Sequence, residues 1–503
     1  VGGDVIFNNS GMVDIQDGSI TLNWGGTHTG TFNVATGKVF NFGGGTHQLN
    51  GATFTGAGDV LQSGATLNLL SNISIGNFSL NSGFVTGAFD LTVNGNLVLG
   101  GNLDNNGNTV VTGTMTWNGG AIGNGTVNGN VTVNGLITMQ NAIHTLSKKT
   151  LNANGGVSHV ASGFYLTDGA IFNLPIGQTY LSNGTGITFN GGAPGVVNNA
   201  GLFHKTVGGN FDISGSISFF NSGTVHIDNG AYRFFGPLNN SGILKGTSAM
   251  SIFDTFVNTG TIAPGASVGE LGITRTPLTN SMLEIELSSN AGPGTGHDRL
   301  NVTGSFVADG TLQVLLLGGY MPEQGTTFQI VNTTGAVTGT FDILDLPEDE
   351  ANWTVTYAPS SIILTFNCNV EGTIVPASPS IACQGESELL TASGGISYVW
   401  STGATTSSIE VSPTVTTTYF VTVSTSMSCT DIASVVVEVQ NHAPYFEITG
   451  NIGFEENVVN PSTGSPYDQY RFEVAYFDVD GDMPISAFPK LQFIVSTHSP
   501  QVL

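Results

Sequence analysis

The stretch that decides the fold is Asn198-Asn199-Ala200-Gly201. Its pattern returns three times, as Asn221-Ser222-Gly223, Asn239-Asn240-Ser241-Gly242 and Asn258-Thr259-Gly260. The four glycines follow one another at intervals of 22, 19 and 18, and an apolar residue follows two positions after each of them: Phe203, Val225, Leu244 and Ile262. A polar turn and a short apolar run that recur at this spacing are typical of a solenoid. One coil cannot bury its apolar face alone, so the coils stack and share a core along one axis.

The same rhythm is present near the N-terminus. Gly26-Thr27-His28 recurs one such interval later as Gly45-Thr46-His47, and Leu91–Gly95 (LTVNG) recurs two intervals later as Val131–Gly135 (VTVNG). Alternating apolar residues within these runs predict strands with one buried face. Asparagine and glycine tolerate the left-handed backbone of sharp corners, and asparagines repeated at one corner can share amide hydrogen bonds. No amphipathic stretch of helix length is present, so the sequence predicts an all-β chain.

The composition limits the partners. Only 9% of the 503 residues are charged, and 71 are glycine, yet the net charge is −25. Residues 1–290 carry 13 acidic and 7 basic side chains, whereas residues 291–503 carry 22 and 3. Such an anionic surface repels phosphate backbones, which argues against nucleic acid as a partner and leaves cations, neutral glycans and proteins.

The sequence shows no membrane-spanning or targeting segment. No run approaches the roughly 18 consecutive apolar residues of a membrane helix, and no basic segment followed by an apolar one opens the chain. Val1 stands in repeat-like sequence without a polar cap, although terminal repeats normally need one. We therefore expect a piece of a longer protein.

The Asn/Gly repeats continue to about residue 290 and are followed by a different series of motifs. These motifs are Asn258–Gly265 (NTGTIAPG), Leu283–Leu287 (LEIEL), Asp298–Gly304 (DRLNVTG) and Gly310–Val314 (GTLQV). Their order resembles the C-terminal end of the β-helical passenger regions of bacterial surface and autotransporter-like proteins, over about residues 198–345. The resemblance implies a right-handed parallel β-helix over 1–290 with coils of roughly 20 residues, closed by a β cap over 291–370. Asp298 and Arg299 are expected to pair and hold this cap.

Residues 371–440 form a second module. Its motifs include Ile381–Gly385 (IACQG), Tyr398–Thr406 (YVWSTGATT) and Thr416–Val423 (TTTYFVTV). They are closely similar to the Ig-like repeats in secreted multidomain proteins of gliding and related bacteria. The resemblance implies a small β-sandwich with Trp400 in its core and a disulfide between Cys383 and Cys429. A small oxidised domain needs such a staple, but spacing alone does not fix the connectivity, so Cys368 is either buried and inert or the alternative partner.

The segment 441–503 is predicted to be β-rich and incomplete. Asp478, Asp480 and Asp482 surround a glycine turn and offer oxygen ligands for calcium. The EF-hand pattern is not met, because its sixth position is Met483, and a solvated β-turn without metal is the alternative. Residues 488–503 resemble the strand and switch-histidine segment of ATPases of the SMC/RecF type, with His498 as the phosphate sensor. No phosphate-binding glycine loop accompanies them, so ATP binding is not predicted.

Catalytic constellations are scarce in the solenoid sequence. Its bases are Lys38, Lys148, Lys149, Lys205, Arg233, Lys245 and Arg275, and its nearest carboxylate pairs are Asp14 with Asp17 and Glu284 with Glu286, which share a strand face. We interpret these charges as structural. His28 and His47 would stack one coil apart, which predicts a surface ladder, with a two-histidine ligand pair for a metal as the alternative. His144, His159, His204 and His226 show no ligand spacing.

Together these patterns predict a secreted or cell-surface bacterial protein without catalytic residues. It would act as an adhesin or scaffold whose Thr- and Asn-rich faces bind glycans or surface proteins through many weak contacts. Calcium at the three aspartates is the only candidate cofactor. The alternative is a polysaccharide lyase or hydrolase, since parallel β-helices also carry such enzymes, although fold analogy alone is weak support.

Overall fold

A computed structural model describes residues 5–160, 162–275, 280–347, 350–382, 386–426 and 429–440, together with the short strands β54 (Tyr445–Glu447) and β55 (Ala475–Phe477). Within these residues all the regular secondary structure is β-strand, apart from a 3₁₀ turn, η1 (Glu350–Asn352), and turns connect the strands. The all-β prediction is therefore confirmed for the described chain. No helix in this part is long and apolar enough to cross a membrane. The chain divides into two compact units, Val1–Asn367 and Cys368–Leu503.

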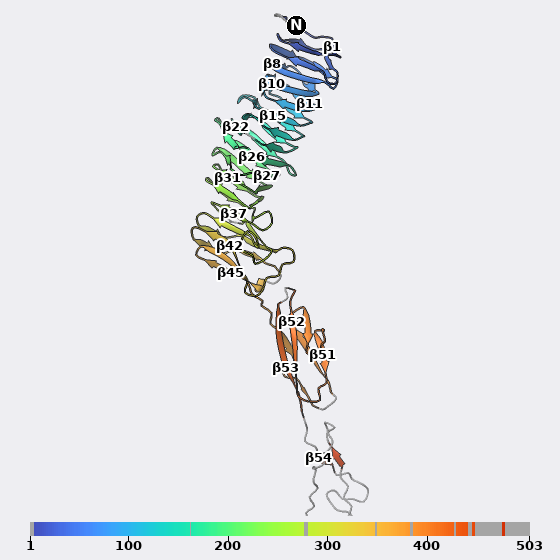
Figure 1. Cartoon of the computed structure of the whole chain (residues 1–503), viewed down its shortest axis with the longest axis vertical. Helices are drawn as coiled ribbons and strands as arrows, with labels where there is room; N and C mark the ends of the chain where they lie inside the picture. The colour runs from blue at the N-terminus through green and yellow to red at the C-terminus, as the bar shows by residue number, and fades with distance from the viewer. Residues whose placement is uncertain are drawn as a thin grey trace, which may run out of the picture. The chain divides into compact units, whose positions relative to one another are not determined.

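The first unit is a parallel β-solenoid of about 13 turns (Figure 1). Its coils build three parallel sheets, which we call sheets I, II and III. Sheet I contains β9 (Ile73–Ile75), β11 (Leu91–Val93), β14 (Thr109–Val111), β17 (Asn130–Val133), β20 (Thr150–Ala153), β23 (Ile171–Leu174), β26 (Gly195–Asn199), β29 (Ile217–Asn221), β32 (Leu238–Asn240) and β35 (Phe256–Asn258). Before β9, the N-terminal coils form a smaller parallel sheet of β1 (Met12–Ile15), β4 (Thr31–Val34) and β7 (Thr53–Thr55).

Sheets II and III follow sheet I in each coil. Sheet II contains β2 (Ser19–Leu22), β5 (Val39–Phe42), the first parts of β8 (Asp59–Leu69) and β10 (Asn77–Gly87), β12 (Leu97–Leu99), β15 (Met115–Trp117), β18 (Ile137–Met139), β21 (Val157–His159), β24 (Thr179–Ser182), β27 (Leu202–Lys205), β30 (Thr224–Ile227), β33 (Ile243–Gly246), β36 (Thr261–Pro264), β38 (Met282–Leu287), β41 (Thr311–Leu316) and β44 (Ile343–Asp345). Sheet III contains β3 (Gly26–His28), β6 (Thr46–Leu49), the second parts of β8 and β10, β13 (Asn102–Leu103), β16 (Ala121–Ile122), β19 (His144–Ser147), β22 (Gly163–Thr167), β25 (Gly186–Phe189), β28 (Asn210–Ile213), β31 (Ala231–Phe234), β34 (Ala249–Ile252), β37 (Glu270–Ile273), β39 (Arg299–Val302) and β42 (Thr327–Thr333).

The core is made of apolar columns that run from coil to coil. Phe203, Val225, Leu244 and Ile262 are register partners in successive strands of sheet II, and all four are fully buried. Successive coils are spaced by one strand-to-strand hydrogen-bonding distance, about 4.8 Å. Burying one such side chain stabilises the fold by about 1.5–3 kcal/mol, so the stacked columns supply the main stabilisation. The predicted repeat therefore corresponds to real stacked coils.

The repeated asparagines form a buried ladder at the corner between sheets I and II. Asn199 donates an amide hydrogen bond to Asn221, Asn221 to Asn240, and Asn240 to Asn258, each at 2.6 Å. These side chains are at most 3% exposed. At the two ends of the ladder, Oδ1 of Asn199 and Nδ2 of Asn258 have no hydrogen-bond partner. The predicted sharing of amide hydrogen bonds between corners is confirmed.

The turn glycines are needed for a different reason from the one the sequence suggested. Gly223, Gly242 and Gly260 are not in the left-handed backbone region. A Cβ atom at Gly242 would lie 2.0 Å from the carbonyl oxygen of Gly223, and a Cβ at Gly260 would lie 2.0 Å from that of Gly242. The coils approach so closely at this corner that no side chain fits between them.

The coils lengthen toward the end of the first unit. Glu270 is the register partner of Arg299 and Met282 that of Thr311, and the first of these pairs is 29 residues apart in sequence. A short parallel pair, β40 (Phe306–Ala308) and β43 (Val337–Gly339), accompanies these coils. The last strands, β45 (Trp353–Ala358) and β46 (Ser361–Phe366), form a hairpin that pairs antiparallel with β42. Parallel stacking thus continues past residue 290 and ends at an antiparallel edge.

The second unit has two sheets around one core. One sheet contains β47 (Thr373–Val375), β49 (Glu388–Ser393) and β51 (Ser408–Val411), and the other contains β48 (Ser380–Ile381), β53 (Thr430–Val439), β52 (Thr417–Ser424) and β50 (Ser397–Trp400). Trp400 is 2% exposed within this core, as predicted, and its indole nitrogen donates to the carbonyl of Thr406 at 2.8 Å.

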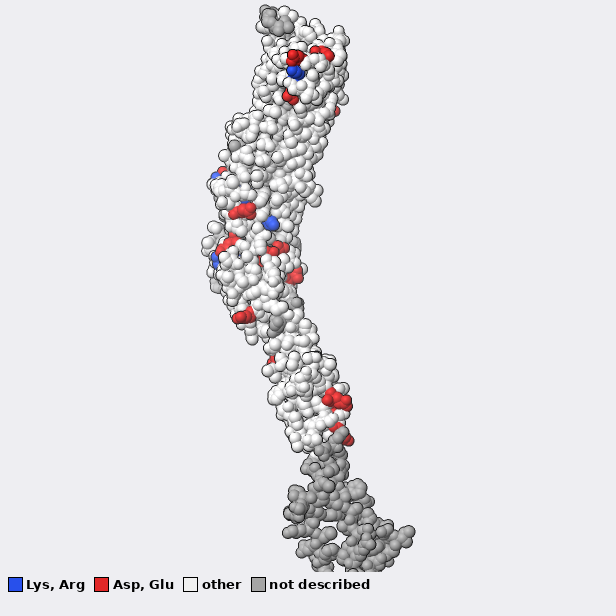
Figure 2. Space-filling view, turned by 45° about the vertical axis from the view of Figure 1, so that its right-hand side comes forward, with Lys and Arg blue, Asp and Glu red and all other residues white. Residues whose placement is uncertain are grey.

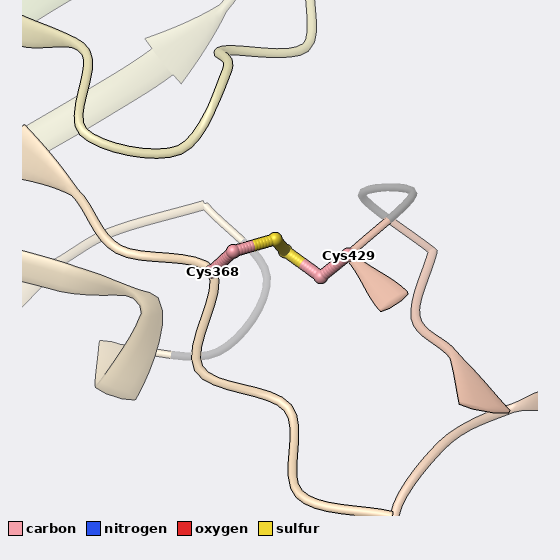
Figure 3. Close-up of a disulfide and its surroundings, with 2 residues drawn as sticks. All are labelled: Cys368 and Cys429. Carbon is pink, nitrogen blue, oxygen red and sulfur yellow. A yellow bond between two sulfur atoms is a disulfide. The ribbon is translucent and has the colours of Figure 1, made fainter. Parts of the chain in front are cut away.

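The disulfide of the second unit joins Cys368 to Cys429, with Cα atoms 5.3 Å apart (Figure 3). The predicted Cys383–Cys429 pair is therefore wrong, because Cys429 has only one disulfide partner; Cys383 itself lies outside the described residues. The backbone N–H of Gly372 donates to the carboxylate of Asp431 at 2.8 Å. This contact brings the beginning of the unit beside the start of β53 and places Cys368 within reach of Cys429.

Candidate functional sites on the solenoid

The residues predicted to bind calcium, Asp478, Asp480 and Asp482, lie outside the described residues, as does His498. The predicted surface ladder of His28 and His47 is wrong, because both side chains are fully buried. Their rings stack with centroids 5.1 Å apart, and Nε2 of His28 lies 2.9 Å from Nδ1 of His47. Nε2 of His47 in turn lies 3.1 Å from the carbonyl of Gly44, so it carries the proton that this contact requires. His28 then donates to His47, and its own Nδ1 is left without a partner.

The predicted pair of Asp298 and Arg299 is also wrong, because each residue binds a different partner. The carboxylate of Asp298 accepts the backbone N–H groups of Gly269 and Glu286 at 2.7 and 2.9 Å. Arg299 instead forms an ion pair with Glu270 at 2.7 Å. Adjacent residues of a strand point to opposite faces, so Asp298 turns inward where Arg299 turns outward.

The other two carboxylate pairs that the sequence offered lie on the outside of the solenoid. Glu284 and Glu286 alternate with buried residues on β38 and share its outward face, as predicted. Asp17 forms an exposed ion pair with Lys38 at 2.7 Å, and Asp14 accepts from Gln16 at 2.6 Å and from Asn33 at 2.8 Å. These contacts fit the structural interpretation of the charges.

The outward face of sheet I carries a row of mostly polar side chains, which is interrupted by Val110, Phe220 and Val257. Ser74, Thr92, Val110, Thr132, Asn152, Asn173, Asn198, Phe220, Asn239 and Val257 follow one another in register. Within the row, Asn152 donates to Thr132, Asn173 to Asn152, and Asn198 to Asn173, at 2.8–3.3 Å. We call this row the amide face. Ser74 and Asn198 are exposed on this face, and its other polar members are half-buried.

A hollow of about 210 Å³ lies at the C-terminal part of the amide face. Asn198, Asn239 and the turn residues Ser222, Ser241 and Thr259 surround it, together with Phe220 and Val257, which are 44% and 47% exposed. An exposed ring among amides and hydroxyls offers stacking contact together with hydrogen-bond donors and acceptors.

A second, larger hollow of about 380 Å³ lies along the edge of sheet III. Its walls come from six successive coils and include Phe84, Asn102, Asp104, Asn124, Thr145, Ser147, Thr167, Asp168 and Asn190. We call it the acidic hollow. Asp104 and Asp168 follow β13 and β22, which are three coil steps apart, so their backbones are separated by about 14 Å along the stack.

The two carboxylates of the acidic hollow have opposite pKa shifts. Burial raises the pKa of Asp104, which is 7% exposed and has an Oδ1 atom without a hydrogen-bond partner. Hydrogen bonds from Ser147 at 2.6 Å and Thr167 at 2.9 Å lower the pKa of Asp168. Asp168 is therefore the more firmly ionised of the two carboxylates, and Asp104 is the more readily protonated.

Lys149 lies behind the acidic hollow and is fully buried inside the solenoid. Its ammonium donates to the side-chain oxygen of Asn105 at 3.2 Å, and burial lowers its pKa to about 8, which the charge of Asp104 partly opposes. A lysine buried so deeply normally needs a partner. Here Asn105 and Asp104 supply that partner from a coil two steps away.

A third group, His204, His226 and Asp228, lies on the outward side of sheet II. Their ligand atoms all lie within 4.8 Å of one another. His204 and His226 are register partners in β27 and β30 and stack with ring centroids 4.6 Å apart. Spacing within a single motif does not reveal this group, because its two histidines belong to different coils. The interval from His204 to His226 equals the interval from Gly201 to Gly223, and this match was the available signal.

Charged groups are sparse elsewhere on the solenoid. Figure 2 shows that most of the surface seen on this side of the first unit carries no formal charge.

A scan against protein-family models finds no match to this chain, and a search of curated proteins finds no significant relative. The class that the structure itself defines is a parallel β-solenoid protein with a disulfide-bonded second unit.

Proposed function

We propose that this chain is an extracellular or cell-surface adhesion or scaffold protein whose amide face binds neutral glycans or surface proteins. The solenoid is proposed to be right-handed, with residues 291–370, which include the hairpin β45–β46, as its cap and an Ig-like module as the second unit. The observation that carries the proposal is the row of outward asparagines and threonines that ends in the hollow around Phe220.

The chemistry of the amide face favours uncharged, hydroxyl-rich ligands. Amide groups donate and accept hydrogen bonds, as sugar hydroxyls do, and an exposed phenylalanine can stack against the apolar side of a sugar ring. Each contact is weak, but a repeat of about 4.8 Å presents many of them side by side, and multivalent ligands gain avidity from this repetition.

The disulfide supports an extracellular location. Disulfides persist in oxidising compartments and are rare in reducing ones. Cys368 and Cys429 are 61 residues apart in sequence and belong to a unit with a small core. A disulfide cross-link stabilises small domains of this kind most strongly.

Glycan arrays probed with the full chain test this proposal. We expect binding to neutral glycans that falls at least about tenfold in Phe220→Ala and in Asn239→Asp, because one removes the stacking ring and the other places a charge on the face. Ile176→Ala is the matched control, since Ile176 is 84% exposed and not part of the amide face. Absence of glycan and cell-surface binding, or equal binding by all variants, would reject the amide face as a binding site.

The acidic hollow favours a second candidate function, hydrolysis of a polysaccharide. A carboxyl group with a raised pKa and a carboxylate with a lowered one are the pair that glycoside hydrolysis requires. The exposed ring of Phe84 and the amides of Asn102, Asn124 and Asn190 could position a sugar chain. The backbones of the two residues are about 14 Å apart, so hydrolysis with inversion requires both side chains to extend toward each other until the carboxyl groups are roughly 6.5–9.5 Å apart.

Incubation of the chain with neutral and acidic polysaccharides separates the two functions. Hydrolysis predicts new reducing ends that disappear in Asp104→Asn and Asp168→Asn but persist in Asp59→Asn, a control on an exposed carboxylate of β8. Binding without new reducing ends would leave the adhesion proposal in place and exclude hydrolysis.

A further inference from the structure

His204, His226 and Asp228 converge at one point on the surface of the solenoid. Nε2 of His204 lies 2.8 Å from Oδ2 of Asp228, and Nε2 of His226 lies 2.9 Å from Oδ1 of the same carboxylate. Only the first contact has hydrogen-bond geometry. Nε2 of His226 is buried and has no hydrogen-bond partner, although it points at an acceptor-rich site.

The stacking of the coils fixes this arrangement. The two imidazole planes are nearly parallel, at 8°, because each ring occupies the same position in its strand. The backbone N–H of Asp228 donates to the carbonyl of Lys205, which ties the carboxylate to the coil of His204. Three potential ligands are thus held by two adjacent coils before any ion binds.

We propose that His204, His226 and Asp228 bind a divalent transition-metal ion of the zinc class, with the remaining coordination positions open to water or to an external ligand. Two imidazole nitrogens and one carboxylate oxygen are a typical ligand set for such ions. In a tetrahedral zinc site, ligand atoms are about 3.3 Å apart, as follows from metal–ligand distances of about 2.0–2.1 Å. To reach this spacing, the two stacked rings have to rotate out of their parallel arrangement toward a common point beside Asp228.

The surroundings favour a borderline-soft metal over calcium or magnesium. Calcium takes six to eight oxygen ligands, whereas this group offers one carboxylate and two nitrogens. His204 and His226 each present an imidazole nitrogen, which zinc-class ions accept readily and calcium does not favour.

The positive charge of Lys245 should weaken the binding of the metal ion. It is the register partner of His226 in the next coil, so a fixed positive charge lies beside the proposed ion. Removing this charge while keeping the length of the side chain should tighten binding, most strongly at low salt. This effect distinguishes the proposed position from other metal sites on the chain.

Zinc titration of the full, untagged chain tests the proposal, with competition against a metal-sensitive dye as readout. All proteins carry Cys383→Ser, so that the third cysteine of the sequence contributes no thiolate. We expect one zinc ion per chain, a loss of affinity of about 100-fold or more in His204→Ala and His226→Ala, and tightening of about fivefold in Lys245→Met. Asp59→Asn is the matched control and should bind as the parent does.

Cobalt provides an independent readout of the ligands. Co²⁺ bound by two imidazoles and a carboxylate in a tetrahedral site should show intense visible d–d bands, which the two histidine variants should lose. Circular dichroism of the variants establishes that the outward substitutions leave the strands folded. Zinc affinity that is unchanged in His204→Ala and His226→Ala, or absent in the parent, would overturn the proposal.

Discussion

Replacing Asn221 by alanine should break the asparagine ladder in its middle. Asn221 accepts the amide of Asn199 at 2.6 Å and donates to Asn240 at 2.6 Å. It also donates to the backbone carbonyls of Gly223 and Ile243 at 3.2 and 3.3 Å. The substitution removes all of these contacts from a residue that is 1% exposed.

The expected cost follows from what each neighbour loses. The amide of Asn199 keeps a hydrogen bond to the carbonyl of Thr224 at 3.1 Å, so it is only partly orphaned. The side-chain oxygen of Asn240 loses its ladder donor inside the core. A lost buried hydrogen bond costs about 1 kcal/mol, and an unsatisfied buried group adds about 1–3 kcal/mol. The total for Asn221→Ala is therefore about 3–5 kcal/mol.

Asn258→Ala is the matched comparison at the end of the same ladder. Asn258 accepts from Asn240 at 2.6 Å and from the backbone N–H of Gly260 at 3.3 Å, but its own Nδ2 has no partner. Its loss should cost only about 1–2 kcal/mol. The two variants remove the same chemical group at the same corner, so the difference of about 2 kcal/mol reports the ladder itself.

Native-state hydrogen exchange is the appropriate assay, because a solenoid opens locally and one global midpoint hides such effects. A difference of about 2 kcal/mol corresponds to about 30-fold faster exchange of the amides in β29 and β32 in Asn221→Ala than in Asn258→Ala. Equal exchange in the two variants, or a cost below about 0.5 kcal/mol for Asn221→Ala, would refute the ladder as a source of stability.

Three further predictions concern other parts of the chain. Desolvation lowers the pKa of His28 from 6.5 to about 4, so the unfolded chain binds more protons than the folded chain between pH 4 and 6.5. The first coils should therefore lose up to about 3 kcal/mol of stability as the pH falls through this range. Hydrogen exchange of these coils that does not depend on pH, after correction for intrinsic rates, would contradict this prediction. Reduction of the Cys368–Cys429 disulfide, which closes a loop of 61 residues, should destabilise the second unit by about 4 kcal/mol, measured by the unfolding transition of its tryptophan with and without reductant. Gly242→Ala should cost about 1–3 kcal/mol because its Cβ would meet the backbone of the previous coil, whereas Gly11→Ala has open space and should leave denaturant unfolding unchanged.

The features that repeat were predictable from the sequence. The apolar column of Phe203, Val225, Leu244 and Ile262 and the buried asparagine ladder follow from a fixed period and a requirement to bury apolar surface. The reason for the turn glycines was not predictable, because a clash with the preceding coil depends on how closely the backbones approach, which no single turn reveals.

The features that depend on side-chain direction were predicted less well. His28 and His47 are in a polar turn, yet the strand that begins there turns them into the core. The partner of Cys429 depends on the contact between Gly372 and Asp431, a hydrogen bond that spans 59 residues. Asp104 and Asp168 line the same hollow although they are three coil steps apart, and a pattern within one coil does not show this relation.

In a solenoid, the neighbours of a residue are set by the coil period, so a binding site has to be sought along the columns of the stack. The column through His204 shows this directly, since it continues through His226 to Lys245 and then to Ala263. The first two positions offer nitrogen ligands, the third places a positive charge, and the fourth has no ligand atom. A metal ion therefore has its site at the first two coils only, where Asp228 completes the ligand set. The site could not be recognised from a local sequence motif, because each residue of this column is one whole coil away from the next along the chain.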